Sequence, residues 1–282
     1  MKIYKKAMAF VIGALLAGGL TACINFSGSY ANADKYLVGT QYYDGELKTL
    51  DINWTQGKVT LIQDETTDHI TVREDNDLPD GKKVHSWFNE GTLYIKFCQS
   101  GYIYTNVVSA DKQLYVTFPK LENLDLDVTS GSAVIEKIDG VKIDVSVTSG
   151  NVEIGEATAE TFTTKVTSGN VNLGDITADK FTCKVTSGKT TLDTLNTKEG
   201  TFNSTSGSVK ANIPSAEKLE FHLTSGNLDL TIPEAGATIT LNKTSGKFSS
   251  TRAHTAENNT YVFGDGVCSI KIKITSGDVT IR

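Results

Sequence analysis

The sequence predicts an all-β protein, a parallel β-solenoid (β-helix-like) built from 19-residue repeats. Three observations lead there: a recurring Thr-Ser-Gly turn, alternating apolar residues on both sides of it, and repeats too small to fold alone. The tripeptide occurs eight times, and the positions of its glycines rise in steps of 19, 19, 19, 19, 19, 20 and 31. They are Gly131, Gly150, Gly169, Gly188, Gly207, Gly226, Gly246 and Gly277. A constant period of this length is the signature of stacked repeats.

Apolar and polar residues alternate along the segments that flank each turn. In the second unit, Ile143 and Val145 precede the glycine and Val152 follows it. Period-two alternation marks strands with one buried face. We therefore expect Val166 to be buried and its neighbour Lys165 to face water.

Each unit is too small to be stable alone. Its inward aliphatic side chains contribute about 10 kcal/mol, at about 2 kcal/mol each. Ordering the unit costs roughly 28 kcal/mol, at about 1.5 kcal/mol per residue. Stacking the units coil on coil satisfies their backbone groups and aligns their side chains in columns. An antiparallel sandwich is the competing fold, but one turn repeated at a strict period argues against it.

The pattern also extends towards the N-terminus. Residues 50–61 reproduce its offsets with Thr55-Gln56-Gly57 in place of Thr-Ser-Gly, and shorter strand-like runs follow up to residue 118. Four segments are therefore predicted. They are a lipoprotein signal peptide at 1–22, a flexible tether at 23–44, degenerate N-terminal β-coils at 45–122 and the regular Thr-Ser-Gly solenoid at 123–282.

The last step between glycines is much longer than the others. It runs from Gly246 to Gly277, and the excess includes the polar run from Arg252 to Asn259. A solenoid end exposes unpaired backbone, which invites association unless something covers it. We expect this insertion to fold near the C-terminal end and to shield or flank the last coil, from Ile270 to Ile281.

The first twenty-three residues resemble a bacterial lipoprotein signal. Three lysines precede an apolar stretch, Ala7 to Gly19, which is too short to span a bilayer. Leu20-Thr21-Ala22-Cys23 then resembles a lipobox, in which the cysteine takes a diacylglyceryl group and the chain is cut before it. Two acyl chains give stable anchoring. Ala31-Asn32-Ala33 offers an ordinary cleavage site, but far beyond the apolar core. We expect an extracytoplasmic protein held on the membrane by the lipid on Cys23.

Charge and cysteine content exclude several classes of function and site. Removing residues 1–22 takes away three lysines and no acids, which leaves 24 basic and 33 acidic residues, a net charge of −9. Such a chain lacks the basic face that nucleic acid requires. Three later cysteines, widely spaced, form neither a disulfide framework nor a metal motif. By strand phase we expect Cys183 and Cys268 to be buried and Cys98 to be exposed.

The recurring Val-Thr-Ser-Gly-x-Val-x-Ile pattern, with Leu-Tyr-Val-Thr-Phe-Pro at 114–119 ahead of it, resembles the DUF4097 family of β-strand-repeat proteins. The resemblance covers about residues 45–282. That family is labelled adhesin-like and includes relatives of the LiaG envelope protein. The resemblance implies the repeat fold and a surface role, and it brings no catalytic residues.

No residues are predicted to be catalytic, to hold a metal or to bind a cofactor. The Thr-Ser-Gly column could display hydroxyls to a ligand or to ice. Its recurrence in every unit favours a structural role, in which glycine supplies a backbone conformation that other residues resist. The four histidines are scattered along the chain. The acidic run Glu74-Asp75-Asn76-Asp77 lacks the spacing of a calcium loop and is interpreted as a solvated turn.

Tyrosines are concentrated before the regular repeats. Exposed aromatic rings can stack on sugars or anchor a protein interface. Two groups, Tyr42-Tyr43 and Tyr102-Ile103-Tyr104, make Tyr42, Tyr43, Tyr102 and Tyr104 the candidate ligand-binding aromatics. The alternative is that the tyrosines fill an irregular end of the core, as Trp54 is expected to do from its inward position.

The predicted function is therefore a non-catalytic, surface-anchored lipoprotein of the bacterial envelope. It would act as an adhesin-like binding or scaffold module for an envelope or host glycan or an envelope protein. A regulatory role in an envelope-stress response is the alternative, and an enzyme acting on polysaccharide is a more distant one. The sequence indicates no oligomeric state.

Overall fold

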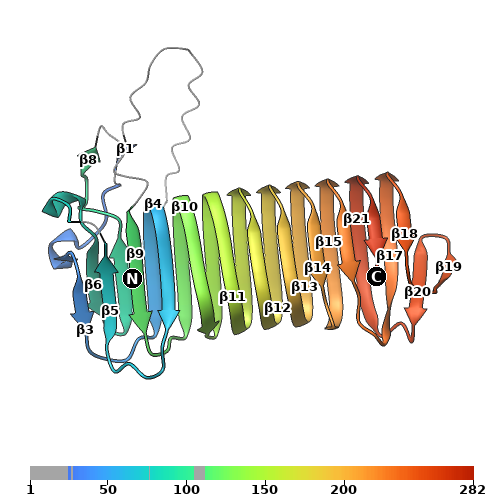
Figure 1. Cartoon of the computed structure of the whole chain (residues 1–282), viewed down its shortest axis with the longest axis horizontal. Helices are drawn as coiled ribbons and strands as arrows, with labels where there is room; N and C mark the ends of the chain where they lie inside the picture. Colours follow the sequence, from blue (N-terminus) through green and yellow to red (C-terminus); the bar gives the residue numbers. More distant parts are fainter. Residues whose placement is uncertain (1–24, 27, 76, 105–111) are drawn as a thin grey trace, which may run out of the picture.

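The computed structural model describes residues 25–26, 28–75, 77–104 and 112–282. This part of the chain forms a stack of β-coils whose axis runs horizontally in Figure 1. Neighbouring central coils pair in parallel and in register, so that Ile143 lies beside Leu124 and Gly150 beside Gly131. The predicted parallel β-solenoid is confirmed.

Seven strands build the central coils. They are β10 (Asn123–Asp139), β11 (Lys142–Ser168), β12 (Val171–Ser187), β13 (Thr190–Ser206), β14 (Val209–Asn212), β15 (Ser215–Ser225) and β16 (Leu228–Thr231). Each coil reverses at two places, which lie along opposite edges of the stack in Figure 1. The Thr-Ser-Gly turns run along the upper edge. The lower edge is the return corner, made of residues 136–141, 155–160, 174–179, 193–198, 212–217 and 231–236.

The interior follows the predicted alternation. Val166 is buried, whereas Lys165 is exposed and its ammonium lies 3.0 Å from an oxygen of Asp144. Cys183 and Cys268 are buried, as expected. Aromatic rings stack inside the coils, with Phe162 and Phe181 nearly parallel at 5.6 Å and Phe202 and Phe221 at 4.5 Å. Because these columns repeat from coil to coil, the stack has one continuous core.

The glycines of the turns form a single column of close backbone contacts. A Cβ on Gly169 would lie 1.6 Å from the carbonyl oxygen of Gly150, and its φ of +143° is one that side chains resist. The column also includes Gly57, so the Thr-Gln-Gly turn belongs to it. Beside the column, the side-chain oxygen of Asn151 accepts a hydrogen bond from the Asn170 backbone N–H at 3.0 Å. This geometry gives the turn a structural role.

At the C-terminal end the coils are not stacked in chain order. The strands here are β17 (Gly236–Ser245), β18 (Phe248–Ser250), β19 (Thr255–Glu257), β20 (Thr260–Gly264), β21 (Cys268–Ser276) and β22 (Val279–Ile281). Ile270 in β21 pairs in parallel with Leu219 on one side and with Ile239 on the other. The last coil in sequence is thus inserted beneath the coil that precedes it.

The expectation for the long insertion is therefore half right. Strands β19 and β20 form an antiparallel hairpin at the end of the stack, and β20 pairs with the free edge of β17. The hairpin covers the coil of residues 236–250 rather than the Ile270–Ile281 coil. The reason is that β21 already has a strand on each side, so β17 is left with the unpaired edge.

The N-terminal end shows a similar inversion. Strand β4 (Thr49–Gln63) pairs with β10 on one side, and with β7 (Thr92–Lys96) and β9 (Gln113–Phe118) on the other. Residues that follow β4 in sequence therefore form the coil outside it. Beyond that coil, β5 (Ile70–Glu74) and β6 (His85–Asn89) run antiparallel to β9 and β7. The segment expected as a set of coils thus holds two coils and an antiparallel cap.

Part of the expected tether also belongs to the cap. Strands β2 (Leu37–Val38) and β3 (Gln41–Tyr43) pair antiparallel with β6 and β5, because these cap strands would otherwise present open edges. The remaining short elements are β1 (Asn25–Phe26), β8 (Ile103–Tyr104) and the 3-10 turns η1 (Ala33–Lys35) and η2 (Asp80–Lys82). Residues 37–38 and 41–43 are therefore strands of the cap, not part of a flexible tether.

A buried ion pair joins the cap to the coils. Lys112 is fully buried, and its ammonium lies 3.1 Å from Glu74, 4.8 Å from the ring centre of Trp54 and 4.1 Å from that of Phe97. It also donates to the carbonyl oxygens of Lys82 and Phe97. Burial raises the pKa of Glu74 and lowers that of Lys112, and the attraction between the two opposes both changes. As predicted, Trp54 points inward.

The exposed position expected for Cys98 is wrong. Cys98 is 2% exposed. Strand β7 ends at Lys96, so its alternation does not continue to Cys98, and the N-terminal segment covers this region. The Tyr30 hydroxyl donates to the Cys98 carbonyl oxygen at 3.0 Å.

Candidate functional site

The hairpin formed by β6 and β7 carries two outward-facing aromatic rings. Trp87 pairs across the strands with Tyr94, and their rings stack at 5.4 Å. The loop residues Glu90 and Gly91 have φ values of +49° and +77°, which suit a tight two-residue hairpin turn. Leu93, next to Tyr94, is buried. The pleat therefore sends the two rings to the opposite, partly exposed face.

Two tyrosines from the N-terminal segment extend this pair. The ring of Tyr36 lies 5.8 Å from that of Trp87, and Tyr30 lies 4.8 Å from Tyr36. We call Tyr30, Tyr36, Trp87 and Tyr94 the aromatic row. Each member is partly exposed. Burial raises the pKa of Tyr30 to about 12 and is also the main cause of a raised pKa for Tyr36. Both tyrosines are thus neutral hydroxyls at neutral pH.

A cavity of about 480 Å³ adjoins the aromatic row. Its lining combines the two tyrosines with polar groups, among them Asp34, Asp80, His85 and Gln99. Burial lowers the pKa of His85, so its imidazole is neutral at neutral pH. Rings beside fixed polar groups are the usual composition of a small-ligand site.

Carboxylates continue from the aromatic row along the same face of the stack. Asp51 pairs with Tyr94 on one side and with Asp125 on the other, and Asp125 pairs with Asp144. We call Asp51, Asp125 and Asp144 the aspartate column. Neighbouring strands are about 4.8 Å apart, so these side chains lie one above another. Rings and carboxylates thus form one surface.

Lysines neutralise the two ends of the aspartate column but not its centre. The ammonium of Lys96 lies 3.2 Å from Asp51, and that of Lys165 lies 3.0 Å from Asp144. Among the salt bridges of the described residues, none involves Asp125. Partial burial and then the neighbouring carboxylates Asp51 and Asp144 raise its pKa. Asp125 is therefore the carboxylate best placed to accept hydrogen bonds from a ligand.

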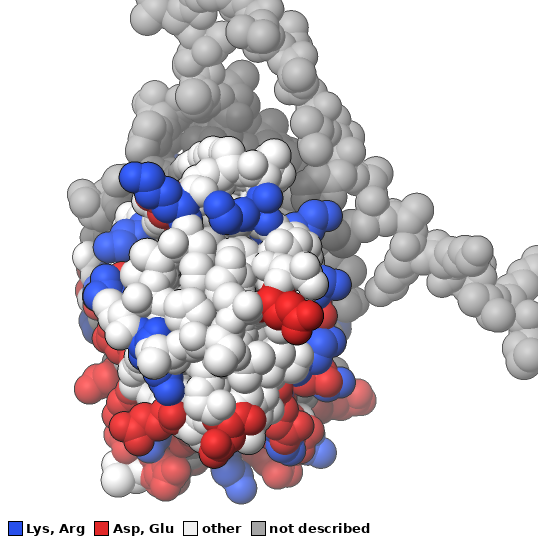
Figure 2. All heavy atoms as spheres, turned by 90° about the vertical axis from the view of Figure 1, so that its right-hand side faces the viewer, with Lys and Arg blue, Asp and Glu red and all other residues white. Residues whose placement is uncertain are grey.

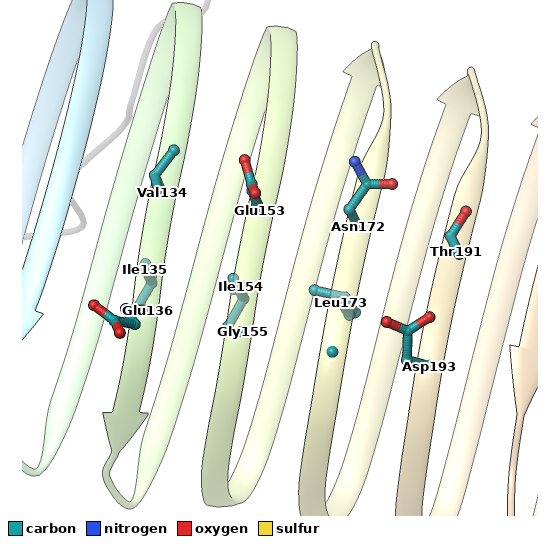
Figure 3. Close-up of a pocket in the computed structure, with 11 residues that line it drawn as sticks. Val134, Ile135, Glu136, Glu153, Ile154, Gly155, Asn172, Leu173, Thr191 and Asp193 are labelled. Carbon is teal, nitrogen blue, oxygen red and sulfur yellow. The ribbon is translucent and has the colours of Figure 1, made fainter.

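A second hollow lies on the strands that follow the turns. Gly155 and Gly174 occupy a column between Glu136 and Asp193, and the missing side chains leave a groove of about 490 Å³ across β10 to β13 (Figure 3). Glu153, Asn172 and Thr191 border it. Its lining combines these polar groups with the aliphatic side chains of Val134, Ile135, Ile154 and Leu173 but includes no aromatic ring. It therefore lacks rings on which a sugar could stack.

The structure separates the four tyrosines chosen from the sequence. Tyr42 is 67% exposed and its ring lies 5.9 Å from His69, whereas Tyr43 is half-buried and shares a 2.8 Å hydrogen bond with Ser86. Tyr102 packs partly buried against the core. Tyr104 pairs through its backbone with Asn25. Ligand binding by these residues stays a prediction.

The aromatic row went unnoticed in the sequence because three separate segments supply it. A signal for half of it was present, since Asn89-Glu90-Gly91-Thr92 between two alternating runs is typical of a tight hairpin. In that hairpin Trp87 and Tyr94 are out of phase with the inward Leu93. Nothing in the local pattern places Tyr36 beside them.

Three further expectations concern regions or groups outside this surface. Cys23, the predicted lipid anchor, lies outside the described residues. Within the described part of the chain, no helix has the length and apolar character needed to cross a membrane. The described residues also contain no group of three or more His, Cys, Asp or Glu side chains arranged to hold a metal ion.

The fold and this surface define a parallel β-solenoid protein with antiparallel caps and an aromatic face at one end. The family model for Toastrack DUF4097 matches residues 47–282, so the chain belongs to the Toastrack DUF4097 family. The predicted membership of the DUF4097 family is thereby confirmed. No curated protein matches the chain.

Solved structures share the fold at low sequence identity. A "putative adhesin" from Bacteroides fragilis is 12% identical with a TM-score of 0.50, and the match covers 87% of this chain and 97% of that one. A "putative lipid binding protein" from Parabacteroides distasonis is 16% identical with a TM-score of 0.51, covering 86% and 97%. At these identities the similarity establishes the fold alone.

Proposed function

We propose that this protein is a non-catalytic, adhesin-like lipoprotein of the bacterial cell surface whose aromatic row and aspartate column bind a glycan. The main support for glycan binding is that partly exposed aromatic rings and a carboxylate without a salt bridge, Asp125, lie on one face of the stack. Aromatic rings offer an apolar surface to a sugar ring. Carboxylates accept hydrogen bonds from sugar hydroxyls. The names of the similar structures, "putative adhesin" and "putative lipid binding protein", accord with a binding role.

Glycan binding is tested with arrays of envelope and host glycans and the full chain. We expect Trp87→Ala to weaken binding at least tenfold, which corresponds to about 1.4 kcal/mol, because stacking on the row is lost. Tyr261→Ala is the matched control, because this partly exposed ring lies at the opposite end of the stack and is not a candidate ligand-binding residue. Equal losses for the two variants would contradict the aromatic row as the site.

Anchoring through Cys23 is a separate part of the proposal. It is supported by the lipobox-like Leu20-Thr21-Ala22-Cys23 that follows an apolar stretch. Cys23→Ala should abolish incorporation of labelled fatty acid and release the protein from membranes. Labelling that persists in this variant would rule out the anchor.

The regulatory alternative makes a different prediction. A component of an envelope-stress response would change stress signalling when deleted, and Trp87→Ala would leave that signalling intact. An adhesin-like binder would show the converse, with lost binding and unchanged signalling.

A further inference from the structure

The two edges of the solenoid carry opposite charge. We define the Thr-Ser-Gly edge as the residues from the fourth before each glycine of the column to the first after it. It contains seven lysines and two aspartates. The lysines are Lys58, Lys165, Lys184, Lys189, Lys243, Lys247 and Lys273, and the aspartates are Asp127 and Asp278.

The return corner has the reverse composition, with nine acidic residues and two lysines. The acids are Glu136, Asp139, Glu156, Glu160, Asp175, Asp179, Asp193, Glu217 and Glu234. Viewed from the C-terminal end, lysines and arginines gather at the top of the molecule, and aspartates and glutamates gather at the bottom (Figure 2). The molecule is polarised across its width, so the net negative charge, which suggested that the chain lacks a basic face, concealed one basic edge.

Most lysines of the Thr-Ser-Gly edge are available to a partner. Of the seven, only Lys165 has a salt bridge among the described residues, and Lys243 donates to the Gly246 carbonyl oxygen at 2.7 Å. The threonine and the serine of all eight Thr-Ser-Gly turns are exposed. Ammonium and hydroxyl groups along one edge are donors suited to phosphate oxygens.

The described chain begins on the side of this edge. Strand β1 pairs with β8, and Figure 1 shows both above the first coils, at the level beyond the Thr-Ser-Gly turns. Asn25, the first described residue, follows Cys23 by two positions. Two residues span at most about 7 Å. A lipid on Cys23 would therefore enter the bilayer on this side of the stack.

We propose that the Thr-Ser-Gly edge is a membrane-facing surface, and that the solenoid lies lengthwise on the anionic lipid headgroups of the bilayer that holds its anchor. This inference rests on the proposed lipid anchor at Cys23. The net negative charge of the chain does not oppose it. The strand before each turn has about eight residues at about 3.3 Å each, which sets the acidic corner about 25 Å away. That distance exceeds two Debye lengths of about 8–10 Å in physiological salt.

The orientation is tested on the lipidated full chain bound to phosphatidylglycerol-containing vesicles. A fluorophore is placed on Ser149→Cys at the Thr-Ser-Gly edge or on Thr158→Cys at the return corner, both exposed positions. The native Cys98, Cys183 and Cys268 are buried and therefore protected from labelling. With a quencher on the lipid headgroups, we expect at least about threefold more quenching at position 149, because quenching weakens with distance and the return corner lies about 25 Å farther from the headgroups.

Two charge variants complete the test. The edge variant changes Lys184, Lys189, Lys247 and Lys273 to Gln. The control variant makes the same change at Lys142, Lys180, Lys198 and Lys218, at or next to the return corner. The edge variant, 1 M salt or pure phosphatidylcholine should each remove the excess quenching, and the control variant should keep it.

Two results would overturn the orientation. The first is a protein that still floats with vesicles but shows equal quenching at the two positions, or unchanged quenching in the edge variant. This result contradicts the orientation and leaves the anchor intact. The other is a protein that fails to float although Cys23 is available for acylation, which contradicts the anchor and the orientation together.

Discussion

The central coils and the N-terminal cap share one hydrophobic core but solve different problems. In the centre, each strand finds a similar neighbour one repeat away, and the outward positions carry small polar or charged side chains. In the cap, antiparallel strands from separate segments close the open edge, and a buried ion pair and the aromatic row appear. Repetition therefore supplies stability, whereas the irregular end supplies chemical variety.

The largest expected loss of stability comes from disrupting the glycine column of the central coils. Gly169→Ala should destabilise the protein by more than about 5 kcal/mol, because the new Cβ would meet a backbone oxygen that neighbouring coils hold in place. Gly39→Ala in the cap is the control. Its φ of +77° is also unfavourable, yet the nearest atom to its Cβ is a lysine side-chain carbon at 3.5 Å. We expect a loss of about 1 kcal/mol there. Urea denaturation measures the free energy of unfolding of both variants. Similar losses would contradict the proposed role of the glycine column in packing the turns.

The next largest loss of stability tests which residues of the central strands point into the core. Val166→Asp places an unpaired charge in the core and should cost about 4 kcal/mol. Lys165→Asp, one residue away, changes only an exposed pair with Asp144 and should cost less than about 1 kcal/mol. Thermal melts of the two variants provide the measurement. Equal shifts would mean that the inward and outward faces are not distinct.

A third variant probes the cap. Lys112→Met leaves Glu74 buried without its partner and should cost about 3 kcal/mol. Adding Glu74→Gln should restore most of that loss, since removing both charges also removes the desolvation penalty. The single variant should recover part of its stability as the pH falls and Glu74 is protonated. Lys184→Met, at an exposed central position, is the control. A single and a double variant of equal stability would contradict a coupled pair.

The smallest effect compares the centre of the aspartate column with its end. The pKa of Asp125 is raised in the folded state, so its charged form opposes folding above that pKa, and the penalty vanishes at acid pH where both states are protonated. Asp125→Asn should stabilise the protein by about 0.5 kcal/mol at pH 7, after allowance for solvent screening, and by nothing at pH 3. Asp144→Asn, which loses the Lys165 pair, should give no stabilisation. Thermal melts at the two pH values decide, and a gain at Asp125 that persists at pH 3 would exclude the electrostatic cause.

Most of the core could be predicted because one local rule repeats. Alternation about each glycine fixes which residues point inward, and Val166, Cys183 and Cys268 follow it. The rule fails where a strand stops, as at Lys96, after which Cys98 is covered by a distant segment. It says nothing about which coil neighbours which. The units of Gly246 and Gly277 have the same alternation, so either could have stacked on the unit of Gly226.

The candidate site was less predictable for a related reason. Sequence composition drew attention to adjacent tyrosines, but adjacent residues in a strand point to opposite faces, as Tyr42 and Tyr43 do. A surface is assembled from residues that share a face across strands. Tyr36, Trp87 and Asp51 meet only because β4 and β7 pair in parallel and the N-terminal segment folds over β6.

The insertion of the last coil beneath its predecessor bears on how the chain reaches its native state. Elsewhere among the central coils, each coil docks on the one that precedes it in the chain, so the stack can grow in the order of synthesis. Residues 236–250 break that order, because the strand they will pair with has not yet been made when they emerge. Asp278 instead bonds to Asn227 across 51 residues. Closing this longer loop is entropically more costly, and contacts distant in sequence form slowly. Completion of the C-terminal end should therefore be the late step of folding. Until β21 has inserted, the edge of β15 is unpaired, and β17 could pair with it in place of β21.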